Sequence, residues 1–148
     1  MVHALEEIQR LLKPDGCLIE IHPVANASRI NVYDGSHILF ADSYPPSDGE
    51  DVRQAEAALD EVVQRRLFFI ERSGEFDLTT FASSVTELRE CFAKLEAYDD
   101  GPKDEALEAQ RTTQYARVDE IMQAAGDGAE VAFHERARIT RLNPNVIK

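Results

Sequence analysis

Positive charge is scarce in this chain of 148 residues, which has 16 Lys and Arg against 28 Asp and Glu and a formal net charge of −12. The phosphate backbone of a nucleic acid is held mainly by clustered Lys and Arg, and anionic lipid attracts the same residues. We therefore expect neither a nucleic-acid partner nor a membrane partner. The basic pair Arg65-Arg66 fits the end of a helix, where positive charge complements the helix dipole.

Long apolar runs are also missing, and no stretch approaches the roughly 20 apolar residues that a membrane-spanning helix needs. Residues 2–13 carry Glu6 and Glu7 inside an apolar repeat. This pattern is unlike a secretory signal, and its acidity is unlike a mitochondrial transit peptide. We therefore expect a cytoplasmic protein.

Cysteine is rare as well, with Cys17 and Cys91 as the two examples in the sequence. They lie far apart, one in an expected strand and one on an expected helix. This spacing supports neither a disulfide nor a metal site, so two reduced thiols in the core are expected.

Hydrophobic residues make up 43% of the chain, and their spacing predicts alternating helices and strands. The first expected helix covers residues 2–13, and the second runs from a Ser47/Glu50 capping box to about residue 66. The third runs from a Ser84/Glu87 capping box to a break at Asp99-Asp100-Gly101-Pro102, and the fourth runs from this break to about residue 125. The expected strands are residues 17–21, 30–33, 36–41 and 129–142.

Two further segments indicate how the strands connect. Asp34-Gly35 stands between two β-prone runs and predicts a hairpin, because such pairs accept the positive φ angles of tight turns. Residues 67–81 are β-prone with Ser73-Gly74 at their centre, which fits either a second hairpin or one strand bent at Gly74. Ordinary strand length favours the hairpin. The expected fold is one α/β domain over residues 1–148 (α+β as an isolated chain), with about four helices and a mixed, largely antiparallel sheet.

The start of the chain carries a family resemblance. The stretch from Leu5 to Gly16 reads as a helix that ends in Leu12-Lys13-Pro14-Asp15-Gly16, with a hydrophobic strand directly after it. It resembles the late part of class I S-adenosylmethionine-dependent methyltransferases, where an L-K-P-G-G turn joins a helix to the next strand. The final segment, residues 129–142, is similar to the last strand of these domains, which runs antiparallel. The family often carries insertions between the two.

The resemblance implies a Rossmann-like architecture and methyl transfer to an acceptor. The family binds its cofactor in its first half, with a strand, a Gly-rich loop and a helix, because the backbone must pass close to the ligand. Here Gly126-Asp127-Gly128 comes nearest to such a loop, but the helix precedes it and the strand follows, as in a helix C-cap. The chain therefore looks like a C-terminal half without its cofactor half. We expect no cofactor for the chain alone and assign no cofactor-binding residue; S-adenosylmethionine is implied by the resemblance.

Four residues are candidates for substrate binding. His22 ends the strand after the Pro-Gly turn, and in open α/β sheets ligands gather at the carboxyl ends of strands, where a histidine can act as a base or bind an acceptor. Tyr33 and His37 flank the hairpin turn and Tyr44 follows it, so these three are placed to line a pocket. Packing is the alternative interpretation of all four. The catalytic residues are unknown.

Other motifs are set aside. His134-Glu135 begins the zinc pattern H-E-x-x-H, but Arg138 stands where the second His is required, and the segment is an expected strand. Acidic pairs such as Asp60-Glu61 fit solvated helix surfaces better than hydrolase or magnesium sites. No metal site is predicted.

Three hypotheses remain open. The first is part of a methyltransferase whose cofactor half comes from a missing segment or a separate polypeptide. The second is a non-catalytic binding or assembly module, and the third is an α+β domain that merely reuses a Pro-Gly turn. Strands that lack their neighbours from a first half leave an unpaired sheet edge. We therefore expect a homodimer, or a partner that supplies the missing half.

Overall fold

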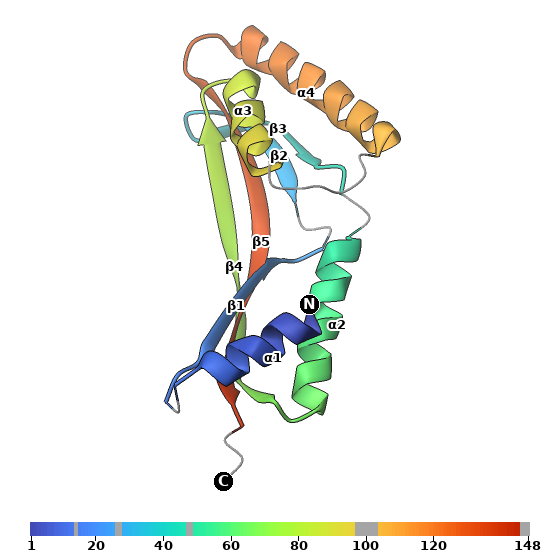
Figure 1. The fold of residues 1–148 in the computed structure, drawn as a ribbon. Helices are drawn as coiled ribbons and strands as arrows, with labels where there is room; N and C mark the ends of the chain where they lie inside the picture. Colours follow the sequence, from blue (N-terminus) through green and yellow to red (C-terminus); the bar gives the residue numbers. More distant parts are fainter. Residues whose placement is uncertain (14, 26–27, 47–48, 97–103, 146–148) are drawn as a thin grey trace. The chain divides into compact units, whose positions relative to one another are not determined.

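The structure is a computed structural model, and it describes every residue except 14, 26–27, 47–48, 97–103 and 146–148; the side chains of 51, 95 and 96 are also outside the description. Within these limits the chain forms four helices and five strands (Figure 1). The helices are α1 (Val2–Leu11), α2 (Glu50–Gln64), α3 (Val85–Glu96) and α4 (Glu105–Ala125), and the strands are β1 (Leu18–Pro23), β2 (Arg29–Asp34), β3 (His37–Ser43), β4 (Phe68–Ala82) and β5 (Ala129–Pro144). The expected α+β fold with about four helices is confirmed.

One antiparallel sheet contains all five of these strands, and β5 organises it by pairing with β1, β2 and β4. β1 pairs with the second half of β5, from Leu18 opposite Leu142 to Pro23 opposite Ala137. β2 pairs with the first half of β5 and, on its other side, with β3. The antiparallel character of the sheet follows from these pairs.

The chain divides into two compact units, which are described separately. Unit 1 comprises Met1–Ala25, Asp48–Asp77 and Arg136–Lys148, and unit 2 comprises Asn26–Ser47 and Leu78–Glu135. The boundaries fall inside β4 and inside β5, so each of these long strands contributes to both units.

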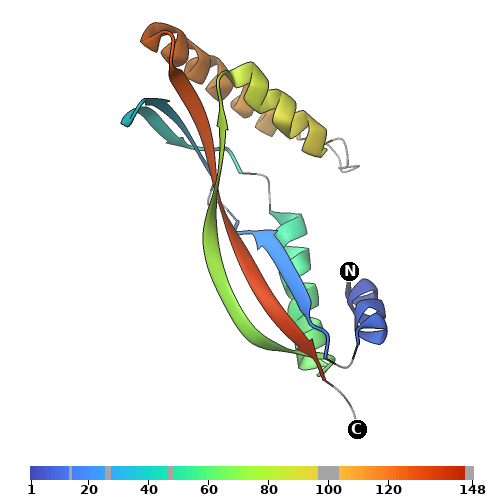
Figure 2. The same ribbon diagram turned by 90° about the vertical axis from the view of Figure 1, so that its left-hand side faces the viewer.

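Unit 1 builds its core between α1, α2 and the strands. One apolar stripe of each helix faces the sheet. The buried cluster consists of Leu5, Ala58, Val62, Phe68 and Leu142. Because side chains alternate along a strand, the paired residues Leu18 and Leu142 face the helices, whereas their neighbours in sequence face away. Figure 2 shows α1 and α2 beside β1 and the second half of β5.

The end of α2 explains why Arg65-Arg66 closes a helix. Arg66 has a φ of 59°, in the left-handed region. The Leu67 amide donates to the Val62 carbonyl and the Arg66 amide donates to the Val63 carbonyl, both over 2.9 Å. These two bonds form a Schellman motif, which satisfies carbonyl groups that the helix end would otherwise leave unpaired.

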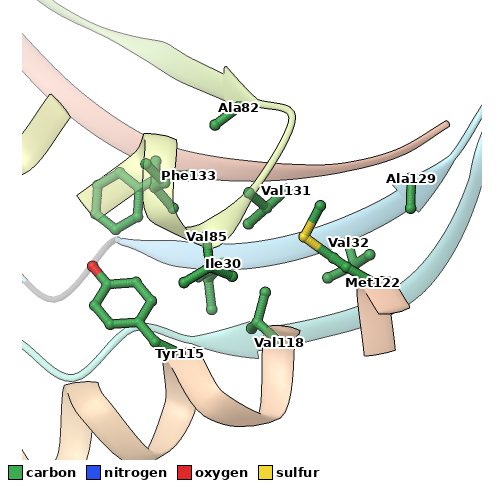
Figure 3. Close-up of a cluster of buried hydrophobic side chains, with 11 residues drawn as sticks. Ile30, Val32, Ala82, Val85, Tyr115, Val118, Met122, Ala129, Val131 and Phe133 are labelled. Atoms are coloured by element: carbon green, nitrogen blue, oxygen red, sulfur yellow. The ribbon is translucent and has the colours of Figure 1, made fainter. Parts of the chain in front are cut away.

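Unit 2 has a second core on one face of its strands. Ile30 and Val32 of β2 are paired with Phe133 and Val131 of β5, so the four side chains share one face, and all four are buried. They pack against Leu88, Val118 and Met122 from α3 and α4, among the residues gathered in Figure 3. The two helices therefore cover one face of this part of the sheet.

The favoured hairpin over residues 67–81 is wrong, because β4 is one continuous strand of 15 residues. Gly74 at its centre is not among the residues with positive φ, and a Cβ added there would meet nothing within 4 Å. The physical reason is the 16-residue β5, which offers a partner along the whole length of β4. Ser73 bonds to Thr140, and Thr79 bonds to His134, so the two strands run antiparallel.

The hairpin at residues 30–41 is confirmed, with a shift of one residue in its turn. The last pair is Asp34 opposite His37, so the loop residues are Gly35 and Ser36. Gly35 has a φ of +56°. Positive φ at the first loop residue is typical of a type II′ turn, which requires glycine at that position.

Replacing Gly35 by alanine should lower the free energy of unfolding by about 1 kcal/mol, because a Cβ is disfavoured at positive φ. Gly74→Ala is the matched control and should be neutral or slightly stabilising, since its backbone is extended and its surroundings are open. Urea unfolding followed by circular dichroism measures both variants. Equal effects of the two substitutions would contradict the turn assignment.

The start of α3 has half of the predicted capping box. Ser84 caps α3 through a 3.1 Å bond from the Glu87 amide, while the Glu87 carboxylate accepts from Ser83 instead of from Ser84. The predicted cap at Ser47 and the break at 99–102 lie outside the described residues.

Cys17 and Cys91 are free and half-buried. Within the described part of the chain, every helix is too short or too polar to cross a membrane.

Candidate functional site

His22 lies one residue before the end of β1, as the sequence predicts, but its position has a different meaning in this sheet. The rule that ligands gather at the carboxyl ends of strands applies to parallel sheets, and β1 and its neighbour β5 are antiparallel. What distinguishes His22 is its environment: its side chain is 7% exposed on the face of unit 1 that the helices cover.

Glu20 is the first partner of His22. The two residues are separated by one position in a strand, so their side chains lie on the same face. Glu20 Oε1 lies 2.7 Å from His22 Nδ1, and the Glu20 side chain is 17% exposed. A short hydrogen bond donated to a half-buried carboxylate fixes the orientation of an imidazole and the ring nitrogen that carries its proton.

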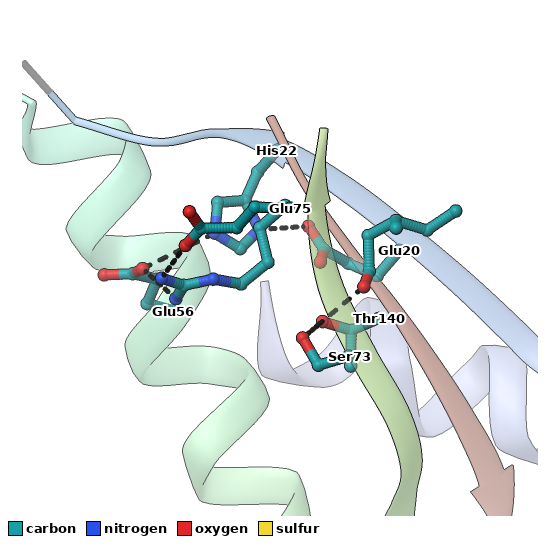
Figure 4. A network of polar contacts seen from close by, with 8 residues as sticks. Glu20, His22, Glu56, Ser73, Glu75 and Thr140 are labelled. Carbon is teal, nitrogen blue, oxygen red and sulfur yellow. Dashed lines mark hydrogen bonds and ion pairs between the residues drawn. The ribbon is translucent and has the colours of Figure 1, made fainter. Parts of the chain in front are cut away.

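The other ring nitrogen, Nε2, faces Glu56 from α2. The distance from Nε2 to Glu56 Oε1 is 3.4 Å, which allows electrostatic attraction, but the two atoms are not aligned as a hydrogen bond. His22 Nε2 is therefore a buried atom without a hydrogen-bond partner among the described residues, and so is Glu20 Oε2. Buried polar atoms in this state call for an explanation, which includes a catalytic role. Figure 4 shows the arrangement.

Arg138 of β5 connects Glu56, the neighbour of His22, to Glu75 of β4. It stands opposite His22 in the β1–β5 register and contacts Glu56 over 3.1 Å and Glu75 over 3.0 Å. The hydrogen bond to Glu75 raises the pKa of Arg138 above its ordinary value, against a smaller opposing effect of burial. The site thus places one imidazole and one guanidinium among three carboxylates.

This arrangement is suited to proton transfer. An imidazole whose Nδ1 is held by a carboxylate and whose Nε2 is unbonded has the geometry of a general base with its orienting acid. Glu20 is then a positioning residue, and Glu56 is a carboxylate 3.4 Å from Nε2. Over the described residues no group of three or more His, Cys, Asp or Glu is arranged to hold a metal ion.

Comparisons with known protein families, curated proteins and solved structures find no match.

Tyr33 belongs to unit 2 and takes part in a different network. Its hydroxyl lies 3.0 Å from His134 Nε2 and accepts a 3.0 Å bond from Asn31 Nδ2. Asn31 and Tyr33 alternate with Ile30 and Val32 along β2, so their side chains lie on the face away from α3 and α4.

His37 and Tyr44 lie apart from that network. His37 is exposed at the start of β3. Tyr44 packs in the core of unit 2, with its ring edge-on to Phe133 at 4.9 Å between centroids and its hydroxyl 2.8 Å from that of Tyr115. Tyr33 and Tyr44 therefore lie on opposite faces of the sheet, and the structure does not bring them into one pocket.

Two cavities in unit 2 are lined by none of the four predicted residues, although Ser43 and Pro45, on either side of Tyr44, line one of them. The larger, of about 480 Å³, lies between α4 and the end of β3, with Gln114, Arg117 and Asp42 in its wall. The other, of about 390 Å³, includes Gly126-Asp127-Gly128. Neither His22 nor Tyr33 contributes to either cavity.

Sequence reasoning found His22 but missed Glu20, Glu56 and Arg138. One signal was present: Glu20 is the acidic residue in an otherwise apolar strand, two positions before a histidine. Glu56 and Arg138 come from an amphipathic helix and a distant strand, and the sequence alone does not reveal the register that places them beside His22.

Replacing His22 by leucine should lower the free energy of unfolding by about 1–3 kcal/mol, because it leaves the half-buried Glu20 carboxylate without its hydrogen bond. His37→Leu is the matched control and should change stability by less than about 0.5 kcal/mol, since His37 is exposed. Urea unfolding at neutral pH tests both, and a His22→Leu variant as stable as the control would argue against the Glu20–His22 bond.

Proposed function

We propose that this chain is the C-terminal part of a cytoplasmic, S-adenosylmethionine-dependent methyltransferase-like protein. It supplies a region that binds the methyl acceptor, and a missing segment or a separate polypeptide supplies the cofactor half. His22 takes a proton from the acceptor or binds it, and Glu20 positions the imidazole.

The pairing of β1 with β5 is the observation that carries this proposal. The two segments that resemble the family, the start of the chain and residues 129–142, contribute these strands, and six residue pairs join them antiparallel. The chain between them includes all of Asn26–Ser47 and Leu78–Glu135, which form unit 2. This division supports the interpretation of the intervening residues as an insertion between two late strands of the family fold.

The Gly126-Asp127-Gly128 turn does not have the arrangement of the family's S-adenosylmethionine loop. Gly126 and Gly128 have φ angles of 84° and 105°, and Gly126 caps α4 by donating to the Met122 carbonyl. They join the end of a helix to the start of a strand, whereas the family's cofactor loop joins a strand to the start of a helix. No reaction step through the cofactor is therefore assigned to this chain.

Calorimetric titration with S-adenosylmethionine tests the proposal. The chain alone should give no binding heat, and its mixture with a polypeptide that supplies the strand–Gly-loop–helix half should bind. In that mixture, His22→Gln should lower the rate of methyl transfer and leave cofactor affinity unchanged, with His37→Gln as the matched control. Binding by the chain alone would overturn the assignment of a missing half, and no methyl transfer with any such partner would overturn the enzymatic function.

A second function, a dimeric binding or assembly module, is favoured by the uncovered face of unit 1. Ile21 and Ile139 are paired across β1 and β5 on the face opposite the helices, and they are 56% and 38% exposed. Ile19, on the same face, is 49% exposed. Contiguous apolar surface of this kind is typical of interaction sites.

We expect a homodimer at high micromolar concentration, because burial of these isoleucines removes apolar surface from water. Ile21→Glu should give monomers, since it places a charge in the interface. Ile38→Glu is the matched control: Ile38 is 59% exposed in unit 2, and its substitution should leave the dimer intact. Light scattering measures the mass of each protein, and a monomeric parent chain would refute self-association.

A further inference from the structure

The strand face of unit 2 that α3 and α4 leave uncovered carries an ordered polar network beside exposed rings. Asn31 and Tyr33 come from β2, His134 from β5, and Thr79 and Phe81 from β4. We call this surface the Tyr33–Phe81 face. It is independent of His22 and of the proposed methyltransferase function.

A chain of hydrogen bonds runs across three strands on this face. Asn31 Nδ2 lies 3.0 Å from the Tyr33 hydroxyl, which lies 3.0 Å from His134 Nε2. His134 Nδ1 lies 3.0 Å from Thr79 Oγ1. Each side chain in the network is therefore held in one orientation by its neighbour.

The neutral tautomer of His134 that carries its proton on Nδ1 gives this chain a direction. An amide Nδ2 can only donate, so the Tyr33 oxygen accepts from Asn31, and in this tautomer the Tyr33 proton is directed to His134 Nε2. The Nδ1–H of His134 then donates to Thr79, and the Thr79 proton has no acceptor within the chain of bonds. At the other end, Asn31 Oδ1 is buried without a hydrogen-bond partner among the described residues, although Asn31 is only 8% exposed.

Aromatic rings lie beside this network. The Tyr33 and Phe81 rings are tilted by 51° with centroids 6.2 Å apart, and Phe81 is 57% exposed. The His134 ring meets Tyr33 edge-on at 6.1 Å. An exposed ring held at the edge of such a cluster offers a surface on which another planar ring can stack at little cost in side-chain entropy.

Positive charge flanks the same place. Arg29 is paired with His134 in the β2–β5 register, so it lies on the same face as His134. It is exposed, and no ion pair is found for it within the described residues. Arg29 on β2 and Thr79 on β4 therefore lie on either side of His134, and in the Nδ1–H tautomer of His134 the Thr79 hydroxyl proton is available to a ligand. Negative charge, from Glu130 opposite Tyr33, is at the other end.

We propose that the Tyr33–Phe81 face binds a small aromatic carboxylate. Its ring stacks on Phe81 beside Tyr33, and its carboxylate accepts from Thr79 and pairs with Arg29 above His134. The rings of Phe81 and Tyr33 favour a ligand with an aromatic ring. Arg29 and the Thr79 hydroxyl favour a ligand with a negative charge.

Titration of the full chain with benzoate, followed by the imidazole NMR signals, tests this site. The His134 signal should shift saturably in the millimolar range, while those of His3, His22 and His37 stay in place. Cyclohexanecarboxylate, which lacks a planar ring, and benzyl alcohol, which lacks the charge, should each bind at least about 5-fold more weakly. A His134 signal that does not move up to the solubility limit of benzoate would overturn the proposal.

Matched substitutions distinguish this face from general aromatic binding. Phe81→Leu and Arg29→Gln should each weaken benzoate binding by about 5-fold or more. Phe69→Leu and Arg72→Gln change residues of the same types, also exposed, on the part of β4 in unit 1. These controls should bind benzoate like the parent chain, and an equal loss of affinity in the controls would refute the assigned site.

Discussion

Replacing Phe68 by alanine is expected to lower the free energy of unfolding by about 3–5 kcal/mol, the usual cost of truncating a fully buried phenylalanine. Phe68 opens β4 and is 0% exposed in the core of unit 1, where it packs with Leu5, Val62 and Leu142. The loss combines apolar surface that is no longer removed from water with a cavity that its neighbours cannot fill. Because folded proteins are only marginally stable, this loss is a large share of the free energy of unfolding of the parent chain.

The neighbouring residue provides the control for this prediction. Phe69 is 45% exposed, so Phe69→Ala should cost about 1 kcal/mol or less. Urea unfolding curves followed by far-ultraviolet circular dichroism give both values. Similar losses for the two variants would mean that β4 is shifted by one residue, because a one-residue shift exchanges the two faces of a strand.

Raising the pH above 10 is expected to destabilise the protein through Tyr115. Burial raises the pKa of its hydroxyl well above the ordinary value of 10.0, and the hydrogen bond with Tyr44 adds to the effect. Below pH 10 the tyrosine is protonated in both the folded and the unfolded chain. Above it, the unfolded chain loses the proton and the folded chain keeps it, so stability falls by up to about 1.4 kcal/mol for each pH unit.

Comparison of the parent chain with Tyr115→Phe isolates this effect. At pH 7 the parent should be more stable by about 1 kcal/mol, because phenylalanine cannot bond to Tyr44. Between pH 7 and 11 this advantage should shrink by about 1 kcal/mol or more and can change sign, because phenylalanine has no proton to lose. Unfolding in urea at both pH values measures the difference, and an advantage that stays constant would contradict the raised pKa.

The helices and the first hairpin were predictable because their signals are local. Apolar spacing located α1 and α2 to within a few residues, and Gly35 marked the turn between β2 and β3. β4 was not predictable in this way. Ser73-Gly74 is chemically suited to a turn, and only the length of β5, more than 50 residues later in the chain, makes an extended Gly74 the better solution.

In the candidate site, too, the sequence predicts the residues with local signals but not those placed by distant segments. His22 was identified from its place at the end of an apolar strand, and Glu20 follows from the two-residue period of that strand. Glu56 and Arg138 depend on how a helix and a strand from elsewhere in the chain pack against β1. His134 begins an incomplete zinc motif in the sequence, and its role beside Tyr33 depends on the β2–β5 register, which no local pattern encodes.

Because β4 and β5 each contribute to both units, neither unit can be isolated simply. The polypeptide passes from one unit to the other four times, at 25/26, 47/48, 77/78 and 135/136, and two of these crossings lie inside strands. No single proteolytic cut releases either unit intact, and no uninterrupted subclone encodes one without pieces of the other. Isolating unit 2 would require a redesigned gene that rejoins Asn26–Ser47 to Leu78–Glu135 through new connections.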